Sequence, residues 1–300
     1  MNKVSNPTNK WTESRRGAVK GQIYSYQNCN ANVEIDRLQL QHWTLHIAFD
    51  GYFQAPVKDT LKRGAKVLDI GNLDNGNGDR VSQIRIYRHR QPLGVPVELQ
   101  AKKQQFRYGR YYGATALRGW IVLLQFFSRI LISPGYISTH ADIFQRNMLT
   151  NVTEKQWPLV LAEYRRILRK GGYIEIVECD IEIRRHGPVG TKTNKKFIEI
   201  IKKRGINATF GITAANVARS VGFADIQHSQ VSIPIGKWGG RLGELFAEDL
   251  RLLLQSVKHI IAPYMGMSIR QFDRNVEVME REVEKYMPYS DFHTTVARKP

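Results

Sequence analysis

The alternation of apolar and polar residues predicts helices and strands in two flanks of the chain. Residues 35–49 carry apolar side chains at helical spacing, which predicts an amphipathic helix that packs beside a binding site. Residues 65–71 (AKVLDIG) form a short apolar run that ends in an acid and a glycine, as buried parallel strands do. Ligands of open α/β sheets bind at the carboxyl ends of such strands, so Asp69 and Gly71 are candidate binding residues. The alternative is that Asp69 only caps a turn.

The second flank predicts a regular series of helices and strands. Thr153 is expected to cap a helix whose apolar face begins at Trp157 and which Gly171 and Gly172 terminate. A strand over residues 173–178 follows at once, which is typical of α/β proteins. Further elements are predicted in this order: a helix around 214–221, an extended stretch over 224–235, helices over 242–261 and 269–286, and a closing strand over 293–298.

The segment between the flanks follows no clean helical or strand period. Residues 72–141 hold ten Lys and Arg but three Asp and Glu, which is +7 of the net charge of +18. A charge of +18 would by itself indicate a nucleic-acid partner. The remaining +11 is spread along the sequence, and we therefore expect no nucleic-acid partner.

Composition narrows the class of protein without naming a function. A chain of 300 residues with 42% hydrophobic and 24% charged residues forms one large or two small globular domains, and is not a disordered, collagenous or disulfide-rich chain. Cys29 and Cys179 are expected to be free thiols in a reducing compartment, the cytoplasm or alternatively the nucleus. The longest apolar run, residues 120–133, contains Gln125 and Arg129 and is too short to span a membrane.

Five stretches resemble one enzyme family. VLDIG at residues 67–71 resembles the first motif of class I S-adenosylmethionine-dependent methyltransferases. LAEYRRILRKGGYIEIVE at residues 161–178 resembles their late helix, Gly-Gly and strand motif. SIPIGKWGG at residues 232–240, GELF at residues 243–246 and the closing VARKP resemble fungal methyltransferases of the secondary-metabolite-regulator type.

This resemblance implies a fold, a cofactor and a reaction. The fold would be a Rossmann-like α/β sheet of seven strands, here incomplete, with a helical insertion before an antiparallel last strand. A methyltransferase domain over residues 34–300 would follow an N-terminal tail, residues 1–33. The cofactor would be S-adenosylmethionine, contacted by Asp69 and Gly71, and the methyl acceptor a small molecule or a protein. No residue is identified as a catalytic base.

The sequence departs from the family at two cofactor motifs. The family continues its first strand into a glycine-rich loop, whereas Gly71 is followed here by Asn72 and the next glycines have the wrong spacing. The strand-end acid that would bind the ribose hydroxyls is also missing, because no Asp or Glu ends a strand between Arg80 and Val97. We expect weak cofactor binding or none, with the side of the first strand exposed.

A shifted reading frame would account for both departures. Back-translated codons of residues 72–90, read one base later, encode a helical pattern, a Tyr-Pro turn and a strand that ends in Asp. The same shift over residues 105–120 gives an acidic stretch that resembles the third motif of the family. We therefore interpret residues 72–142 as aberrant, with the frame restored by Arg146; a divergent basic insertion is the alternative.

Other features leave rival functions open. The chain contains no Cys/His cluster or HExxH motif, and the acidic stretch over residues 74–79 lacks the spacing of a calcium loop, so no metal site is predicted. Arg146 and Asn147 could face a substrate, although structural roles are the simpler interpretation, and Trp238 could border an acceptor pocket. The rival functions are a non-catalytic basic module that binds nucleic acid or protein, and the non-functional product of a damaged gene.

Overall fold

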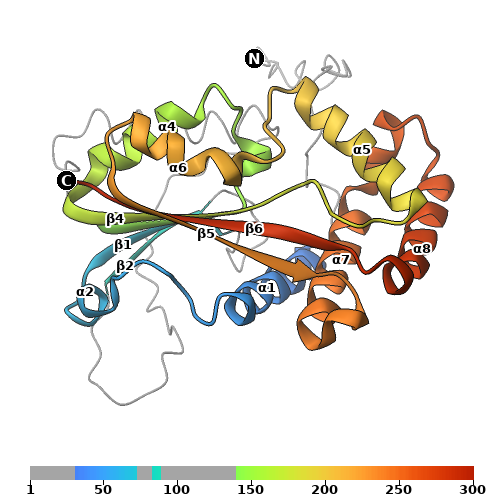
Figure 1. Cartoon of the computed structure of the whole chain (residues 1–300), viewed down its shortest axis with the longest axis horizontal. Coiled ribbons are helices and arrows are strands. Elements are labelled where there is room, and N and C mark those ends of the chain that lie inside the picture. Colours follow the sequence, from blue (N-terminus) through green and yellow to red (C-terminus); the bar gives the residue numbers. More distant parts are fainter. Residues whose placement is uncertain (1–30, 73–82, 89–139) are drawn as a thin grey trace, which may run out of the picture.

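The computed structural model describes residues 31–72, 83–88 and 140–300, which form a mixed α/β structure around one sheet (Figure 1). The sheet has six strands in the order β2-β1-β3-β4-β6-β5. Its strands are β1 (Lys66–Asn72), β2 (Gln83–Arg88), β3 (His140–Arg146), β4 (Leu168–Cys179), β5 (Ala224–Pro234) and β6 (Tyr289–Arg298). No helix in the described part of the chain is long and apolar enough to cross a membrane.

Strand directions divide the sheet into two halves. β1, β3 and β4 are parallel, with Leu68 opposite Ile143 and Ile143 opposite Ile174. β6 runs antiparallel to both of its neighbours, β4 and β5. The closing strand that the sequence predicted is therefore the reversed strand of the sheet, as the resemblance implied for the last strand.

Helices cover both faces of this sheet. They are α1 (Ala31–Ala48), α2 (Lys58–Lys62), α4 (Trp157–Ile167), α5 (Pro188–Lys203), α6 (Phe210–Ser220), α7 (Gly240–Tyr264) and α8 (Ile269–Tyr286). In Figure 1, α4, α5 and α6 lie above the sheet, and α1, α2 and part of α7 lie below it. Short 3-10 turns at Leu149–Asn151 and Lys237–Gly239 precede α4 and α7.

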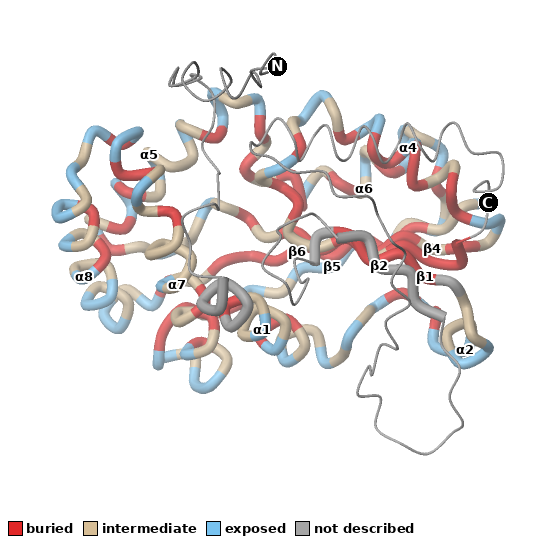
Figure 2. The backbone as a smooth tube through the Cα atoms, turned by 180° about the vertical axis from the view of Figure 1, so that it is seen from behind, coloured by how far each residue is buried: buried red, intermediate tan, exposed pale blue. Residues whose placement is uncertain are grey.

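Alternating side chains of the central strands contribute to hydrophobic clusters on both faces of the sheet. Leu68, Ile143 and Ile174 point toward α4 and α6, where Trp157 stacks on Phe210 with ring centroids 3.8 Å apart. Val177 and its neighbours on the other face pack against Leu45 of α1 and Phe246 of α7. Figure 2 shows the result, with buried residues along the strands and exposed residues on the outer turns of the helices.

The sheet differs from the sequence prediction at its β1 edge. Seven strands were expected, and the described residues form six. The side of β1 was expected to be exposed, but β2 pairs with it in antiparallel register, Leu68 opposite Ile86. That expectation was wrong. An open strand edge has unpaired backbone N–H and C=O groups, and a neighbouring segment can pair with them whether or not it carries the family motif.

The ends of α4 also differ from the prediction. Thr153 does not cap this helix: α4 begins at Trp157, and the Thr153 backbone N–H donates to the side chain of Gln156 at 2.9 Å. Gly171 and Gly172 do not terminate it either, because α4 ends at Ile167 and both glycines lie within β4. The Gly171 N–H donates to the Lys299 carbonyl at 2.8 Å, and positive φ at Gly171 (75°) permits this irregular start of the strand.

Other predicted segments lie partly outside the described residues. The tail over residues 1–33 does so except for residues 31–33, which already belong to α1. The aberrant segment over 72–142 is described at Asn72, in β2 and at the start of β3. Cys29, residues 120–133, the stretch 74–79 and the shifted stretch 105–120 lie outside the description.

β3 bears on where the proposed shift ends. β3 pairs in parallel with β4 from His140, with one irregularity between His140 and Asp142, and with β1 from Asp142, and four of its first five residues are buried. A sequence that fits the centre of the sheet is therefore present from His140, six residues before the point inferred from motifs.

Candidate functional site

The candidate site lies where the parallel strands β1, β3 and β4 reach their carboxyl ends. Ligands of open α/β sheets bind at this edge because helix N-termini and loop backbones converge there. Asp69 and Gly71 lie in the last four residues of β1, and Arg146 is the last residue of β3. The structure thus brings candidates from two adjacent strands, β1 and β3, to the same edge of the sheet.

Asp69 forms an ion pair with Arg146. Its carboxylate Oδ2 lies 3.5 Å from Nη2 of Arg146, and the residue is 7% exposed. Asp69 does not cap a turn: it sits opposite Phe144 within the sheet, and β1 continues through Gly71 to Asn72. The Arg146 cation fixes the orientation of the Asp69 carboxylate within the strand. A fixed orientation suits a ligand-binding residue and a structural residue alike.

Helix α1 covers this edge of the sheet and supplies polar and aromatic side chains. The ring of Tyr52, in the loop after α1, stacks on His46 at 4.3 Å and on His42 at 5.7 Å. Burial lowers the pKa of His42, and the nearby Arg146 cation lowers it further. His42 is therefore a neutral imidazole at neutral pH, able to accept a proton or a hydrogen bond.

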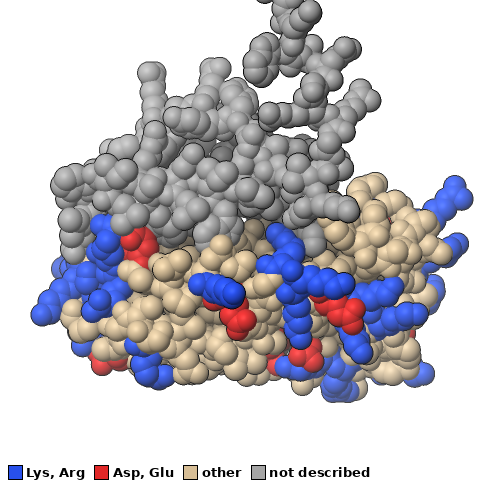
Figure 3. Space-filling model, turned by 90° about the horizontal axis from the view of Figure 1, so that it is seen from above, with Lys and Arg blue, Asp and Glu red and all other residues tan. Residues whose placement is uncertain are grey.

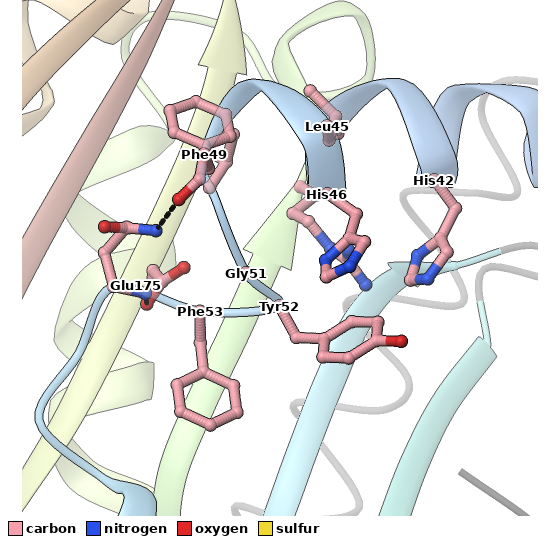
Figure 4. A pocket seen from close by; sticks show the side chains of 11 residues that line it. His42, Leu45, His46, Phe49, Gly51, Tyr52, Phe53 and Glu175 are labelled. Carbon is pink, nitrogen blue, oxygen red and sulfur yellow. Dashed lines mark hydrogen bonds between the residues drawn. The ribbon is translucent and has the colours of Figure 1, made fainter. Parts of the chain in front are cut away.

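A small pocket opens between α1, the loop after it and the strands (Figure 4). Its volume is about 20 Å³, which is room for about one water molecule. The lining residues are His42, Leu45, His46, Phe49, Gly51, Tyr52, Phe53, Gln54, Arg146, Glu175 and Val177. The pocket is thus half aromatic, with one cation and one carboxylate.

Glu175 fixes the loop that forms one side of this pocket. Its Oε2 accepts hydrogen bonds from the backbone N–H groups of Gln54 and Ala55, both at 2.7 Å. Burial raises the pKa of the Glu175 carboxyl, and those two N–H donors lower it. The carboxylate is committed to the backbone and is unsuited to serve as a mobile base.

A second buried carboxylate, Glu178, orders the loop after β3. It accepts hydrogen bonds from the backbone N–H groups of Met148 (2.9 Å) and Leu149 (3.0 Å), and a short one from the Gln145 side chain. Burial raises its pKa to about 8. Asn147 in this loop donates to the Gln41 side chain at 2.9 Å, so the structure gives Asn147 a contact with α1.

This pocket is too small for S-adenosylmethionine, and neither Asp69 nor Gly71 is among the described residues that line it. Drug-sized ligands occupy pockets of about 300–1,000 Å³, more than ten times the space found here. No acid in the described residues ends a strand next to β1 on its outer side, where a ribose contact would be needed, because β2 carries the sequence QIRIYR. Nor do the described residues contain a cluster of His, Cys, Asp or Glu suited to a metal ion.

Sequence reasoning found some of this site and missed the rest. It placed Asp69, Gly71 and Arg146 at the strand ends and α1 beside them. It missed His42, His46, Tyr52, Glu175 and Glu178; the i, i+4 spacing of the two histidines was the available signal. Trp238 is not among the pocket residues, and its indole N–H donates to the Ile235 carbonyl at 2.7 Å.

Comparisons with known proteins give structural similarities only. No family model and no curated protein matches the sequence. Phosphoethanolamine N-methyltransferase 2 of Haemonchus contortus, solved with S-adenosyl-L-methionine, is 15% identical with a TM-score of 0.32, over 55% of this chain and 34% of that one. The cyclopropane synthase MmaA2 of Mycobacterium tuberculosis is 11% identical with a TM-score of 0.32, over 61% of this chain and 68% of that one.

A third similar structure also carries the cofactor. Geranyl diphosphate methyltransferase in complex with SAM is 14% identical with a TM-score of 0.26, over 57% of this chain and 55% of that one. The match spans about a third of the length of the Haemonchus enzyme. Similarities at this level assign neither an activity nor a substrate to this chain.

Proposed function

We propose that this chain is a class I S-adenosylmethionine-dependent methyltransferase by descent, with an incomplete cofactor site. One observation carries the proposal: the parallel strands β1, β3 and β4 are followed by a reversed strand, β6, inserted between β4 and β5. The family motifs in the sequence imply this arrangement. The cofactor is S-adenosylmethionine, and Asp69 and Gly71 at the end of β1 are its proposed contacts.

The finer features of the proposal come from the family resemblance. The type is that of fungal secondary-metabolite regulators, with a domain over residues 34–300. We assign the helical insertion, which would shape an acceptor pocket, to α7 and α8, the helices between β5 and β6. The acceptor would be a small molecule or a protein.

The missing cofactor motifs argue for weak cofactor binding. Gly71 is not followed by the glycine-rich spacing of the family, and the ribose-binding acid has no counterpart in β2. We attribute this to a shifted reading frame over most of residues 72–142. Methyl transfer by the chain as given is therefore weak or absent.

Isothermal titration calorimetry tests the cofactor proposal directly. The full chain, titrated with S-adenosylmethionine and with S-adenosylhomocysteine, should show no saturable binding with a Kd below about 100 μM. A Kd of that size corresponds to about 5.5 kcal/mol of binding free energy. A chain in which residues 72–139 are replaced by the shifted reading should bind in the micromolar range. Asp69→Ala in that repaired chain should weaken binding at least tenfold, whereas Asp59→Ala, at an exposed residue of α2, should not.

Three results would overturn parts of this proposal separately. Micromolar binding by the chain as given would refute the incomplete site. An unbroken open frame in the transcript, shared with independent homologues over residues 72–142, would refute the frame shift. Failure of the repaired chain to bind either ligand would refute descent from a methyltransferase.

A further inference from the structure

The excess positive charge of residues 140–300 gathers on one side of the sheet. The helices α4, α5 and α6 with their flanking residues (154–170, 188–204 and 210–220) carry twelve Lys and Arg and three Asp and Glu. The rest of residues 140–300 carries thirteen Lys and Arg and fifteen Asp and Glu. The surface formed by α4, α5 and α6, called here the basic face, thus holds +9 while the remainder is close to neutral.

Many of these cations are exposed. Figure 3 looks onto this side and shows Lys and Arg along its described length, with fewer Asp and Glu between them. The exposed cations of the basic face are Lys155, Arg169, Lys170, Lys192, Lys195, Lys202, Lys203 and Arg219. Of its three acids, Glu163 is buried and bound in bidentate fashion by Arg166, at 2.7 and 2.8 Å, so it offsets little of the surrounding charge.

Positive groups lie at both ends of α4. Lys155 precedes the helix, and the neighbouring Glu154 N–H donates to the Gly205 carbonyl at 2.8 Å, which places this end beside the cationic end of α5. Arg169 and Lys170 follow the other end. Because α4 has 11 residues, its ends are about 16 Å apart, which is the axial rise of about five nucleotides in a duplex.

The Arg169 end of α4 is also crowded with cations. Arg165 donates to the Gly222 carbonyl at 3.0 Å, and Lys299 Nζ donates to the Leu168 carbonyl at 2.6 Å. Burial lowers the pKa of Lys299, and repulsion from Arg165 and Arg166 lowers it further. Like charges are thus held together here without an equal number of acids, so an external polyanion would relieve the repulsion.

We propose that the basic face binds nucleic acid through its phosphate backbone, without reading the bases. This replaces the expectation, drawn from the charge along the sequence, that nucleic acid is not a partner. A phosphodiester backbone offers evenly spaced negative charges over the length that α4, α5 and α6 cover, and such contacts need no shaped pocket.

Two other anionic partners fit the surface less well. A membrane surface calls for a cluster of apolar side chains beside the cations, and the exposed large hydrophobic residues on these three helices are Leu159 and Ile212, one on α4 and one on α6. An acidic protein partner would be expected to contact exposed aromatic side chains. On this face Trp157, Tyr164 and Phe210 are buried and Phe197 is partly buried against the core.

Fluorescence anisotropy on the full chain tests the proposal. A labelled 20-base-pair DNA duplex of random sequence and an RNA duplex of the same length are titrated at salt concentrations from 50 to 200 mM. We expect binding that weakens as salt rises, with a slope of log affinity against log salt near −4 to −6. A scrambled duplex of the same length should bind equally well, because no base is read.

Charge reversal on matched surfaces locates the contact. The variant K192E/K195E/K202E/K203E should lose at least tenfold in affinity at 100 mM salt and flatten the slope by about 2 to 4. The control R241E/R270E/R274E/R281E changes four exposed arginines of α7 and α8 by the same charge and should lose less than threefold. Circular dichroism shows whether the charge-reversed variant folds. If it does not, the neutral variant K192Q/K195Q/K202Q/K203Q is tested in its place.

Several outcomes would overturn the proposal. These are equal losses in both charge-reversed variants, an affinity that does not change with salt, and binding to vesicles with 30% phosphatidylserine or to polyglutamate at least as strong as to the duplexes. Cofactor binding does not enter this experiment, so its result is independent of the proposed methyltransferase origin.

Discussion

The buried carboxylate of Glu178 orders the loop that joins β3 to α4. It is fully buried and receives two backbone N–H groups and one side-chain amide. Sequence alone placed this residue at the end of a predicted strand and gave it no role. Its partners are 29 to 33 residues away along the chain, so no local pattern could have shown them.

Glu178→Ala should destabilise the protein by about 3 kcal/mol at pH 6.5. The substitution leaves the buried N–H groups of Met148 and Leu149 without an acceptor, and each such loss costs about 1–3 kcal/mol. Urea unfolding followed by circular dichroism measures the change. Glu199→Ala, at an exposed position on α5, is the control and should shift stability by less than about 0.5 kcal/mol. Equal effects of the two substitutions would contradict the role assigned to Glu178.

The candidate site residues also show that a local sequence pattern does not reveal contacts between distant segments. Asp69, Gly71 and Arg146 were found because the carboxyl ends of strands are recognisable in sequence. His42, His46 and Tyr52 were not found, since their stacking depends on how the loop after α1 folds back over the helix. That fold is fixed by Glu175, which binds two backbone groups of the loop from more than 100 residues away.

At the level of elements, a close contact between turn and helix explains Gly236 of the SIPIGKWGG stretch and Gly243 of the GELF stretch. The Gly236 N–H donates to the Gly243 carbonyl at 3.0 Å, and Gly236 has a φ of 111°. A Cβ on Gly243 would overlap the Gly236 carbonyl oxygen, and a Cβ on Gly236 would overlap Val283 of α8. The glycines thus let the turn after β5 dock on both α7 and α8.

Gly243→Ala should destabilise the protein by about 3 kcal/mol, because the new methyl group meets backbone that cannot yield. The sign of the change in stability distinguishes the two cases, because a Gly to Ala substitution within an unobstructed helix stabilises the protein by about 1 kcal/mol. Thermal and urea unfolding measure the change. Glu244→Ala, the next residue of α7, provides the control and should stay within about 0.5 kcal/mol. Stabilisation by Gly243→Ala would contradict the close approach.

Most helices and strands of the described part could be predicted from periodicity. The helix predicted over residues 269–286 matches α8 (Ile269–Tyr286), and the predicted strand over 173–178 lies within β4. The ends of α4 could not be predicted, because Leu168 leaves the helix to pair with His140 of β3 before the two glycines are reached. Strand pairing between Leu168 and His140 therefore ends the helix before the Gly171-Gly172 pair that the sequence offered as its end.

For the whole molecule, the titration of buried groups predicts how stability depends on pH. Burial raises the pKa of Asp142 to about 6 and of Glu178 to about 8, and lowers that of His186 to about 4. The carboxyl groups contribute stability that is lost as pH rises through their folded pKa. His186, whose folded pKa lies below 6.5, contributes stability that is lost as pH falls toward 4.

Stability should therefore fall by about 2 kcal/mol between pH 6.5 and 8, where Glu178 dominates. Urea unfolding at half-unit pH steps measures this fall. Glu178→Gln, which cannot ionise, should flatten the curve in that window, whereas His186→Gln should change it only below pH 6.5. A wild-type curve that is level from pH 6.5 to 8 would contradict the burial argument.

The sequence by itself determined most helices and strands of both flanks, because apolar periodicity acts over a few positions along the chain. It also determined the net charge and the resemblance of the strand-end motifs. Only the tertiary structure decided what lies beside β1, which side chains close the pocket, and that the positive charge of residues 140–300 gathers on α4, α5 and α6. Each of these depends on segments that are far apart in the chain and meet through packing, and one-dimensional spacing carries no information about such meetings.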